Sequence, residues 1–470
     1  MIFTTPLPFI KEFIDQLDQG IRDCAPTRKL SKAQRWWLSF CLMGILLSNS
    51  VCWAAFERVG LGGYQQAALS WMFRGSKLLW PLLLHVSIML VLRRYGITEG
   101  VLVGDDSDRQ RAKVTQRIFG AYKVFDKKTG GYFNGQTMVF LFLVTPTVSL
   151  PVGFRFYQPD PVVKAWKKNE EKLKQQGVKK SERSPRPAPN PAYPSKGQLL
   201  LDLLEEFKFY HPGFVVKAIL ADALYGSNWF MNRAAEVFRT QTISQLSKSQ
   251  TIRFRNREMS VAQYFATYPG VEITLRIRGW KDVKVVLGSA RLYVKAHQQK
   301  RFVVALKYEG EEDYRYLVAS DLSWRAVDIA AAYTLRWLIE VFFEDWKLHE
   351  GWGRFAPPLD EEGSSRGLTL SLLLDHALLL HPEQRARLEN HLPACTVGSL
   401  QQQSRMEALI EVIRGIVNAQ NPHEKLDEIV EIAKKLFPLN SSAKHMNGRD
   451  VGRLEPTPSL KYRAAACMAA

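Results

Sequence analysis

The chain has 470 residues, enough for about three domains of roughly 150 residues each. Hydrophobic residues make up 46% and charged residues 23%, a composition that is typical of globular proteins and excludes a disordered or fibrous chain. Lys and Arg outnumber Asp and Glu by 64 to 46. The resulting net charge of +18 indicates a polyanionic partner, either nucleic acid or an anionic membrane surface.

The cysteine pattern and the N-terminus indicate a reducing compartment. The five cysteines are scattered without a C-x-x-C motif, which argues against a disulfide scaffold and a zinc ribbon. The first residues show no basic segment followed by an apolar core, so we identify no signal peptide. The uncharged run 36–56 contains three consecutive polar residues at 48–50, and we interpret it as buried helix. We therefore expect a cytoplasmic protein without a membrane partner.

Residues 1–97 are predicted to form a helical N-terminal domain. Segments 51–58 and 64–73 flank a Gly-rich turn and have the outline of a helix-turn-helix, which any two short helices around such a turn share. We interpret residues 1–97 as the DNA-binding domain.

Residues 98–382 show the mixed strand and helix pattern of an α/β domain, including one long helix from about 324 to 348. Two segments stand out from this pattern. Residues 161–198 are basic and rich in proline, and we expect their cations to aid DNA binding without assigning them a further role. Residues 241–308 are β-rich, with 13 Lys or Arg against 3 Asp or Glu. Residues 383–470 are predicted to be a helical C-terminal region with a basic tail.

Three acidic residues stand out because of their positions. Asp106 and Asp222 each follow an apolar β run, and active groups collect at strand ends in α/β sheets. Glu340 lies inside the long predicted helix. Asp105 and Asp108 are interpreted as turn or cap residues, although spacing alone does not exclude Asp105 as the functional carboxylate.

Four polar residues of the long helix are aligned. At 100° per residue, Tyr333, Arg336, Glu340 and Lys347 fall in one stripe only about 60° wide. The apolar side chains lie on the opposite side: Leu335, Leu338, Ile339, Phe342, Phe343 and Trp346. Two or three carboxylates can hold two Mg²⁺ ions for in-line attack on a phosphodiester, and nearby cations can position the strand. We expect Mn²⁺ to substitute for Mg²⁺.

The pattern Tyr333-x2-Arg336-x3-Glu340-x6-Lys347, with Trp337 directly after the Arg, resembles the YREK signature of DDE transposases from bacterial cut-and-paste insertion sequences. The resemblance covers roughly residues 98–380. It implies an RNase H-like catalytic core with a β-rich insertion, flanked by the helical N-terminal and C-terminal regions.

Carried over to this sequence, the resemblance implies a role for each matching residue. Asp106, Asp222 and Glu340 would be the catalytic metal ligands. Tyr333, Arg336 and Lys347 would contact the phosphates of the transposon end, and Trp337 would be a further DNA-binding residue.

The resemblance also implies an aromatic side chain that stacks on a flipped base, from the strand that leads into the Glu340 helix. Counting back from Tyr333 places Tyr316 at this position, where the family usually has Trp. Trp324 and Trp280 are alternatives, and Tyr316 could also be an ordinary strand aromatic.

Other functions explain less of the sequence. A DNA-binding regulator accounts for the net charge but not for the aligned stripe, and a related metal-dependent nuclease would lack strand transfer. The H-x-x-R motif of tyrosine recombinases and the Gly-Lys of a P-loop are both absent. We therefore expect a Mg²⁺-dependent transposase that acts as a homodimer on terminal inverted repeats and target DNA at the bacterial nucleoid. The sequence does not distinguish hairpin formation from other routes to second-strand cleavage.

Overall fold

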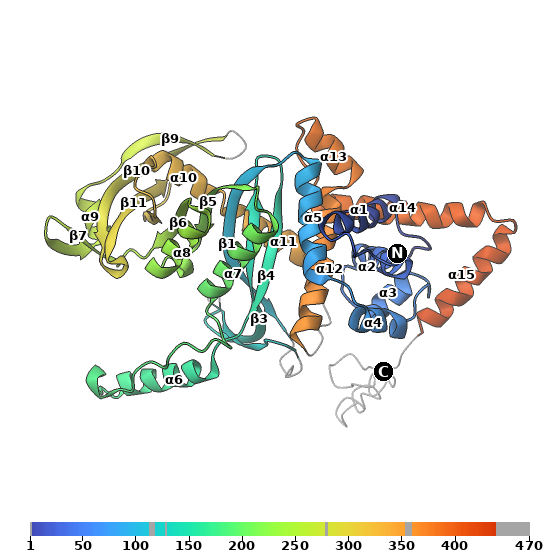
Figure 1. Cartoon of the computed structure of the whole chain (residues 1–470), viewed down its shortest axis with the longest axis horizontal. Coiled ribbons are helices and arrows are strands. Elements are labelled where there is room, and N and C mark those ends of the chain that lie inside the picture. The colour runs from blue at the N-terminus through green and yellow to red at the C-terminus, as the bar shows by residue number, and fades with distance from the viewer. Residues whose placement is uncertain (1, 112–117, 127–128, 278–280, 353–359, 439–470) are drawn as a thin grey trace, which may run out of the picture. The chain divides into compact units, whose positions relative to one another are not determined.

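The computed structural model describes residues 2–111, 118–126, 129–277, 281–352 and 360–438 (Figure 1). Residues Met1–Gly415 group into one compact unit and Ile416–Ala470 into a second. The predicted boundaries at 97 and 382 fall inside the first unit, and the division of the chain at these points stays a prediction.

Five helices precede the first strand: α1 (Pro8–Cys24), α2 (Lys32–Ser48), α3 (Trp53–Val59), α4 (Gln66–Gly75) and α5 (Trp80–Arg94). Ser31 caps α2, since its hydroxyl accepts from the backbone N–H of Gln34 at 3.1 Å. α2 is apolar on nearly all sides and is buried, while α1 buries one face. Between α3 and α4 the chain turns through Gly62, whose φ of +71° suits glycine.

Within the described residues, no single helix is long and apolar enough to cross a bilayer. Two sharply bent pairs, α2 with α3 and α4 with α5, satisfy the length and composition criteria only when each pair is taken together.

One mixed sheet of twelve described strands forms the centre of the first unit. Its strands are β1 (Glu99–Gln110), β2 (Tyr122–Phe125), β3 (Tyr132–Val144), β4 (Ser149–Tyr157), β5 (Val215–Ala221), β6 (Gln241–Leu246), β7 (Thr251–Phe254), β8 (Arg257–Ser260), β9 (Val271–Ile277), β10 (Lys281–Val294), β11 (Gln299–Tyr308) and β12 (Arg315–Ala319). The order is β2-β3-β1-β5-β6-β12-β11-β10-β7-β8, with β4 on β3 and β9 on β10. β1, β5 and β6 run parallel to one another.

Figure 1 shows the N-terminal helices at one end of this sheet and strands β7 to β11 at the other. The first strand of the predicted β-rich segment, β6, pairs with β5 and therefore belongs to the parallel part of the sheet. Strands β7 to β11 extend the sheet, and residues of β7, β10, β11 and β12 form a second hydrophobic core with α9 (Val261–Thr267).

Nine further helices are described after β4. They are α6 (Pro161–Gln175), α7 (Lys196–Tyr210), α8 (Asn228–Phe238), α10 (Ala326–Thr334), α11 (Trp337–His349), α12 (Glu361–Leu379), α13 (Pro382–Glu389), α14 (Val397–Val417) and α15 (Pro422–Leu436), with short 3₁₀ turns at Lys180–Glu182, Ala223–Tyr225 and Lys295–His297.

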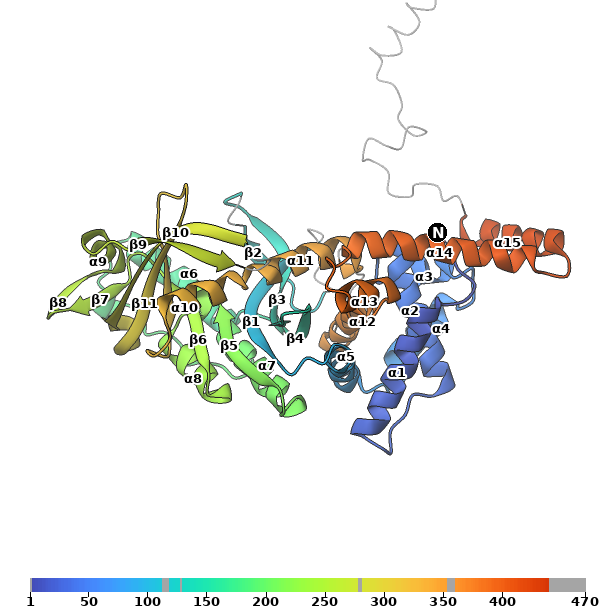
Figure 2. The same ribbon diagram turned by 90° about the horizontal axis from the view of Figure 1, so that it is seen from above.

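α7 and α11 cover opposite faces of the sheet (Figure 2). On one face, a Cβ on Gly104 would lie 2.2 Å from the side chain of Leu200 in α7, so glycine at this position lets α7 pack closely on β1. On the other face, Phe140 of β3 packs against Phe343 of α11 with ring centroids 5.3 Å apart. Successive residues of β1 therefore face different helices.

The long helix expected from about 324 to 348 is broken. α10 ends at Thr334 and α11 begins at Trp337, and the backbone N–H of Arg336 bonds to the carbonyl of Tyr333, three residues back, at 3.1 Å. β1 also differs from expectation, because antiparallel pairing with β3 carries it through the acidic cluster to Gln110.

Candidate active site

The two strand-end positions predicted from the sequence meet at the parallel pair β1 and β5. Gly104 lies opposite Ala221, so the acidic residues that follow them in the chain are neighbours. Asp105 and Asp106 point to different sides of β1. Asp105 faces α11, whereas Asp106 faces α7.

On the α11 side, one guanidinium links two carboxylates. Nη1 of Arg336 lies 2.6 Å from Oδ2 of Asp105 and 3.4 Å from Oε1 of Glu340, one helical turn further on. Asp105 is 6% exposed, and burial raises its pKa to about 7, with the negative charge of Asp222 adding to the shift and Arg336 opposing it. Asp105 therefore needs a positive charge nearby to be ionised.

On the α7 side, a lysine takes the corresponding place. Nζ of Lys196, the first residue of α7, lies 2.6 Å from Oδ2 of Asp106 and 5.3 Å from the centre of the Tyr157 ring. Ser195 caps this helix through the backbone N–H of Gln198 at 3.2 Å, which fixes the start of α7 beside the strand.

Asp222 lies between the two sides. Its Oδ1 accepts from the backbone N–H of Leu224 at 2.9 Å, and its carbonyl accepts from Ser244 at 2.6 Å. Burial raises the pKa of Asp222, and the charge of Asp106 contributes to the shift. The structure thus brings Asp222 together with Asp105, Asp106 and Glu340.

Two residues of the site were missed by the sequence analysis. Lys196 is hidden at the end of the basic segment, where it looks like one lysine among many. Tyr225 follows Asp222 by three residues and is buried, and this burial, together with the charges of Asp106 and Asp105, raises the pKa of its hydroxyl well above the usual value. The spacing D-A-L-Y after a buried strand was the available signal.

The residues predicted to bind DNA differ in exposure. Tyr333 is 8% exposed and its hydroxyl lies 3.4 Å from the carbonyl of Ala221, at the end of β5. Lys347 has its ammonium 5.6 Å from the centre of the Phe343 ring. Trp337 is 66% exposed. Trp337 is therefore exposed to solvent, whereas Tyr333 is buried against the end of β5.

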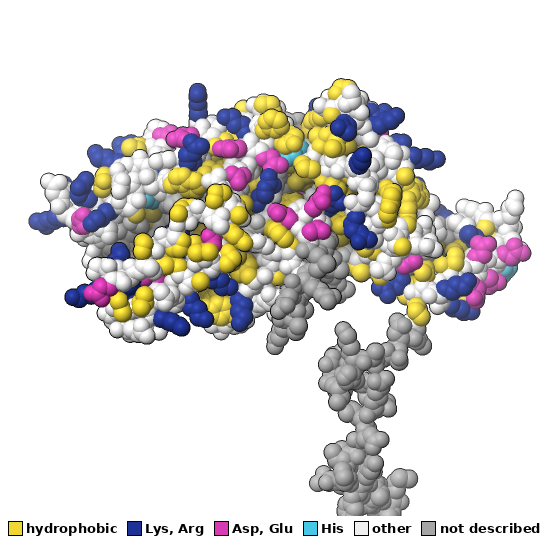
Figure 3. All heavy atoms as spheres, turned by 60° about the horizontal axis from the view of Figure 1, so that its bottom comes forward, with side chains coloured by type: hydrophobic (Ala, Val, Ile, Leu, Met, Phe, Trp, Pro, Cys, Tyr) yellow, Lys and Arg dark blue, Asp and Glu magenta, His cyan; other side chains and the backbone are white. Residues whose placement is uncertain are grey.

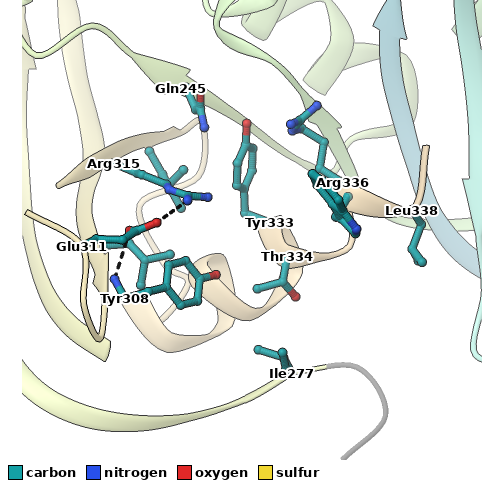
Figure 4. Close-up of a pocket in the computed structure, with 12 residues that line it drawn as sticks. Gln245, Ile277, Tyr308, Glu311, Arg315, Tyr333, Thr334, Arg336 and Leu338 are labelled. Atoms are coloured by element: carbon teal, nitrogen blue, oxygen red, sulfur yellow. Dashed lines mark hydrogen bonds and ion pairs between the residues drawn. The ribbon is translucent and has the colours of Figure 1, made fainter. Parts of the chain in front are cut away.

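A pocket of about 500 Å³ lies beside Arg336, between β11, β12 and the start of α11 (Figure 4). Tyr308, Tyr333, Arg315 and Trp337 line it. Tyr316 does not, because its neighbours on β12 face the pocket.

Tyr316 lies instead in the second hydrophobic core. It is 7% exposed and stacks on Phe265 with ring centroids 5.9 Å apart. The structure therefore does not bring Tyr316 together with the other predicted site residues. Trp324 is half-buried, and Trp280 lies outside the described residues.

The donor chemistry of the cluster fits divalent cations. Four carboxylates, those of Asp105, Asp106, Asp222 and Glu340, converge with two cations, Arg336 and Lys196, which leaves an excess of negative oxygen ligands. As the side chains lie, no three His, Cys, Asp or Glu residues of the described chain are close enough together to hold a metal ion. A metal ion shared by Asp105 and Glu340 would compete with Arg336 for their oxygens.

Comparison with known families supports this chemistry. Residues 25–267 match a family model described as "DDE superfamily endonuclease". The match includes Asp105, Asp106 and Asp222 and ends before Glu340. A search of curated proteins found no match. Because the family match spans more than half of the chain, the protein belongs to the DDE superfamily endonucleases, a family of enzymes that act on DNA.

Proposed function

We propose that this DDE superfamily endonuclease is a transposase that binds terminal inverted repeats and catalyses Mg²⁺-dependent strand cleavage and strand transfer. The observation that carries the proposal is the convergence of Asp105 and Asp222, at neighbouring strand positions, with the Arg336–Glu340 turn of α11. The YREK spacing supports the finer assignment to cut-and-paste insertion sequences. The parallel β1, β5 and β6 with helices on both faces support an RNase H-like core.

We assign the metal-binding role to Asp105, Asp222 and Glu340. Asp106, the ligand expected from the resemblance, shares a face with Lys196 rather than with Glu340. Divalent cations held by these carboxylates would activate the attacking oxygen and stabilise the leaving oxygen of a phosphodiester.

The protein's own cations have separate tasks in this mechanism. Arg336 neutralises Asp105 and Glu340 until a DNA phosphate approaches, and then donates to that phosphate. Lys196 holds Asp106 toward α7. The half-buried positions of these groups limit competition from water.

A cleavage assay on the DNA that flanks the protein's own gene tests the proposal. Nicks should appear at defined ends in Mg²⁺ or Mn²⁺ and disappear with a chelator, and the released 3′ ends should join to a second DNA. Cleavage without joining would favour a nuclease that lacks strand transfer. Specific binding without any cleavage would favour a DNA-binding regulator.

We expect the exposed face of α4 to carry part of the end recognition. Gln66, Trp71 and Arg74 are exposed there, after the Gly-rich turn. Gln66→Ala and Arg74→Ala should each lower the affinity for specific ends by about 1–3 kcal/mol while leaving the affinity for unrelated duplex nearly unchanged. Fluorescence anisotropy at one fixed salt concentration measures both. Point variants suit this test because the N-terminal helices contribute to the main hydrophobic core. An unchanged ratio of the two affinities would remove α4 from recognition.

The pocket beside Arg336 is lined by Trp337, and we predict that this side chain stacks on a base. Trp337→Ala should impair second-strand processing by about 1–3 kcal/mol, as expected when one base loses its stacking partner, and should leave first-strand nicking nearly intact. Tyr316→Ala should lower thermal stability, because it opens a cavity beside Phe265, without separating the two steps. If only Tyr316→Ala impairs second-strand processing without impairing first-strand nicking, and Tyr316→Trp restores the lost step, Tyr316 stacks on the base as the family resemblance implies.

A further inference from the structure

We propose that residues 161–194, here called the basic arm, clamp the phosphate backbone of double-stranded DNA beside the carboxylate cluster, independently of base sequence. The basic arm consists of α6 and the chain that returns from it to Ser195. The proposal rests on the proposed function, which makes DNA the substrate. It adds which face of this segment contacts the DNA and where that contact lies relative to the carboxylate cluster.

The basic arm is folded but does not belong to the hydrophobic core. No residue of α6 is buried, and Figure 1 shows the helix set apart from the sheet. Asp160 caps α6, accepting from the backbone N–H of Val162 at 2.8 Å. The returning chain covers one side of the helix, because Nε1 of Trp166 donates to the carbonyl of Ser184 at 2.9 Å.

An ion pair strengthens this contact. Nη1 of Arg183 lies 2.8 Å from Oε1 of Glu170, and both side chains are largely shielded from solvent. Arg183 also donates from Nε to the carbonyl of Val178 at 2.9 Å. Trp166 and Glu170 therefore mark the covered side of α6.

The opposite side of α6 carries lysines. With 100° per residue, Lys164, Lys168 and Lys172 fall within about 80° of one another and about 120–160° from Trp166, and all three are exposed. The whole basic arm has nine Lys or Arg and three Glu, a net charge of +6. This side of the helix presents a row of cations at a spacing of about one helical turn.

Prolines restrict the returning chain. Positions 185, 187, 189, 191 and 194 are all Pro. Such a segment has a fixed φ at each proline and behaves as a semi-rigid spacer. Because Trp166 and Arg183 join this restricted chain to α6, ordering the arm on DNA costs less conformational entropy than ordering a flexible loop.

Both ends of the basic arm lie at the candidate active site. The arm leaves β4 shortly after Tyr157 and ends just before Lys196, and these two residues contact each other and Asp106 through the lysine. A duplex held along α6 therefore runs past the carboxylates.

The charge of the arm selects DNA over a second copy of the chain. The chain has a net charge of +18, so another copy repels a segment of +6. Val162 is the one large apolar side chain that α6 exposes strongly, which leaves little surface for a protein interface. On the face shown in Figure 3, Lys and Arg are scattered among Asp and Glu rather than gathered in one stripe.

The test measures binding of a fluorescent 30-base-pair duplex without element ends to the full chain across a salt series. The triple variant Lys164→Gln, Lys168→Gln, Lys172→Gln keeps residues that favour helix and removes three charges. Its affinity at 0.15 M salt should fall at least about tenfold, and the slope of log affinity against log salt should fall by about 0.9 for each phosphate that the variant no longer neutralises. Glu171→Gln, in the same row, should tighten binding.

A matched control changes three exposed lysines of α15, Lys425→Gln, Lys434→Gln and Lys435→Gln, and should leave affinity and slope unchanged. An equal fall in affinity in both triple variants, or no fall in the α6 variant, would overturn the proposal for the basic arm while leaving the proposed function intact. A wild-type chain that binds no duplex at any salt would instead overturn the proposed function. A change of oligomeric state in light scattering, with DNA binding unchanged, would show that a second copy is the partner.

Discussion

Asp222→Ala and Glu340→Ala should each reduce strand cleavage in Mg²⁺ at least about 10³-fold, equivalent to about 4 kcal/mol of barrier, while DNA binding persists. The reason is that both carboxylates belong to a cluster with more negative oxygens than the nearby Arg336 and Lys196 can neutralise. Gel analysis of nicked ends measures the loss, and anisotropy measures binding. A variant that still cuts removes that residue from the active site.

The same assay separates the tandem aspartates. Asp105 points to the side of β1 on which Arg336 and Glu340 lie, so the Asp105→Ala variant should be inactive. Asp106→Ala should retain cleavage at a reduced rate, because this carboxylate pairs with Lys196 on the other face. Inactive Asp106→Ala with active Asp105→Ala would instead support the register implied by the family resemblance.

Glu350→Gln should stabilise the protein at pH 8 and change its stability little at pH 4. Glu350 ends α11 with no exposed surface, and its two carboxylate oxygens accept no hydrogen bond from the described residues. Burial, with the charge of Asp375 adding to it, raises the pKa of Glu350 well above its usual value. Burial raises the pKa of Asp375 from 3.8 to about 7. The two carboxyls therefore share a site that favours the neutral acids.

The direction of the pH effect follows from proton linkage. Between about pH 4 and pH 7 the folded protein keeps protons on this pair that the unfolded chain has released, so stability falls as the pH rises through this window. Urea unfolding at both pH values measures the gain from Glu350→Gln, with the exposed Glu344→Gln of the same helix as the control. Loss of stability at pH 8 would show that Glu350 is ionised and paired.

The sequence by itself indicated the chemistry of the site. Two carboxylates after apolar strand runs and the spacing of Arg336 and Glu340 are local features, because strand ends and one helical turn are set by neighbouring residues in the chain. In the structure Arg336 lies 3.4 Å from Glu340, and its charge acts on Asp222. The mixed α/β class was also readable from the alternation of strand and helix patterns.

Other features depended on contacts between distant segments. Which of Asp105 and Asp106 faces Glu340 depends on the side of β1 that α11 covers, and a shift of one residue reverses the answer. The break between α10 and α11 contains no Gly or Pro from which it could have been predicted. Tyr316 has an aromatic ring that could stack on a base, yet the pleat of β12 directs this ring toward Phe265.

Lys196 is the clearest example of a site residue that the sequence alone does not identify. In the sequence it is one of many cations beside a solvated segment, and nothing within a few residues indicates an acidic partner. Its carboxylate, Asp106, lies 90 residues away and is reached only because α7 packs on β1 through Gly104. Local patterns determined which residue types the site contains, whereas packing across the sheet decided which of them meet, since the face of a strand that a helix covers is set by the whole fold.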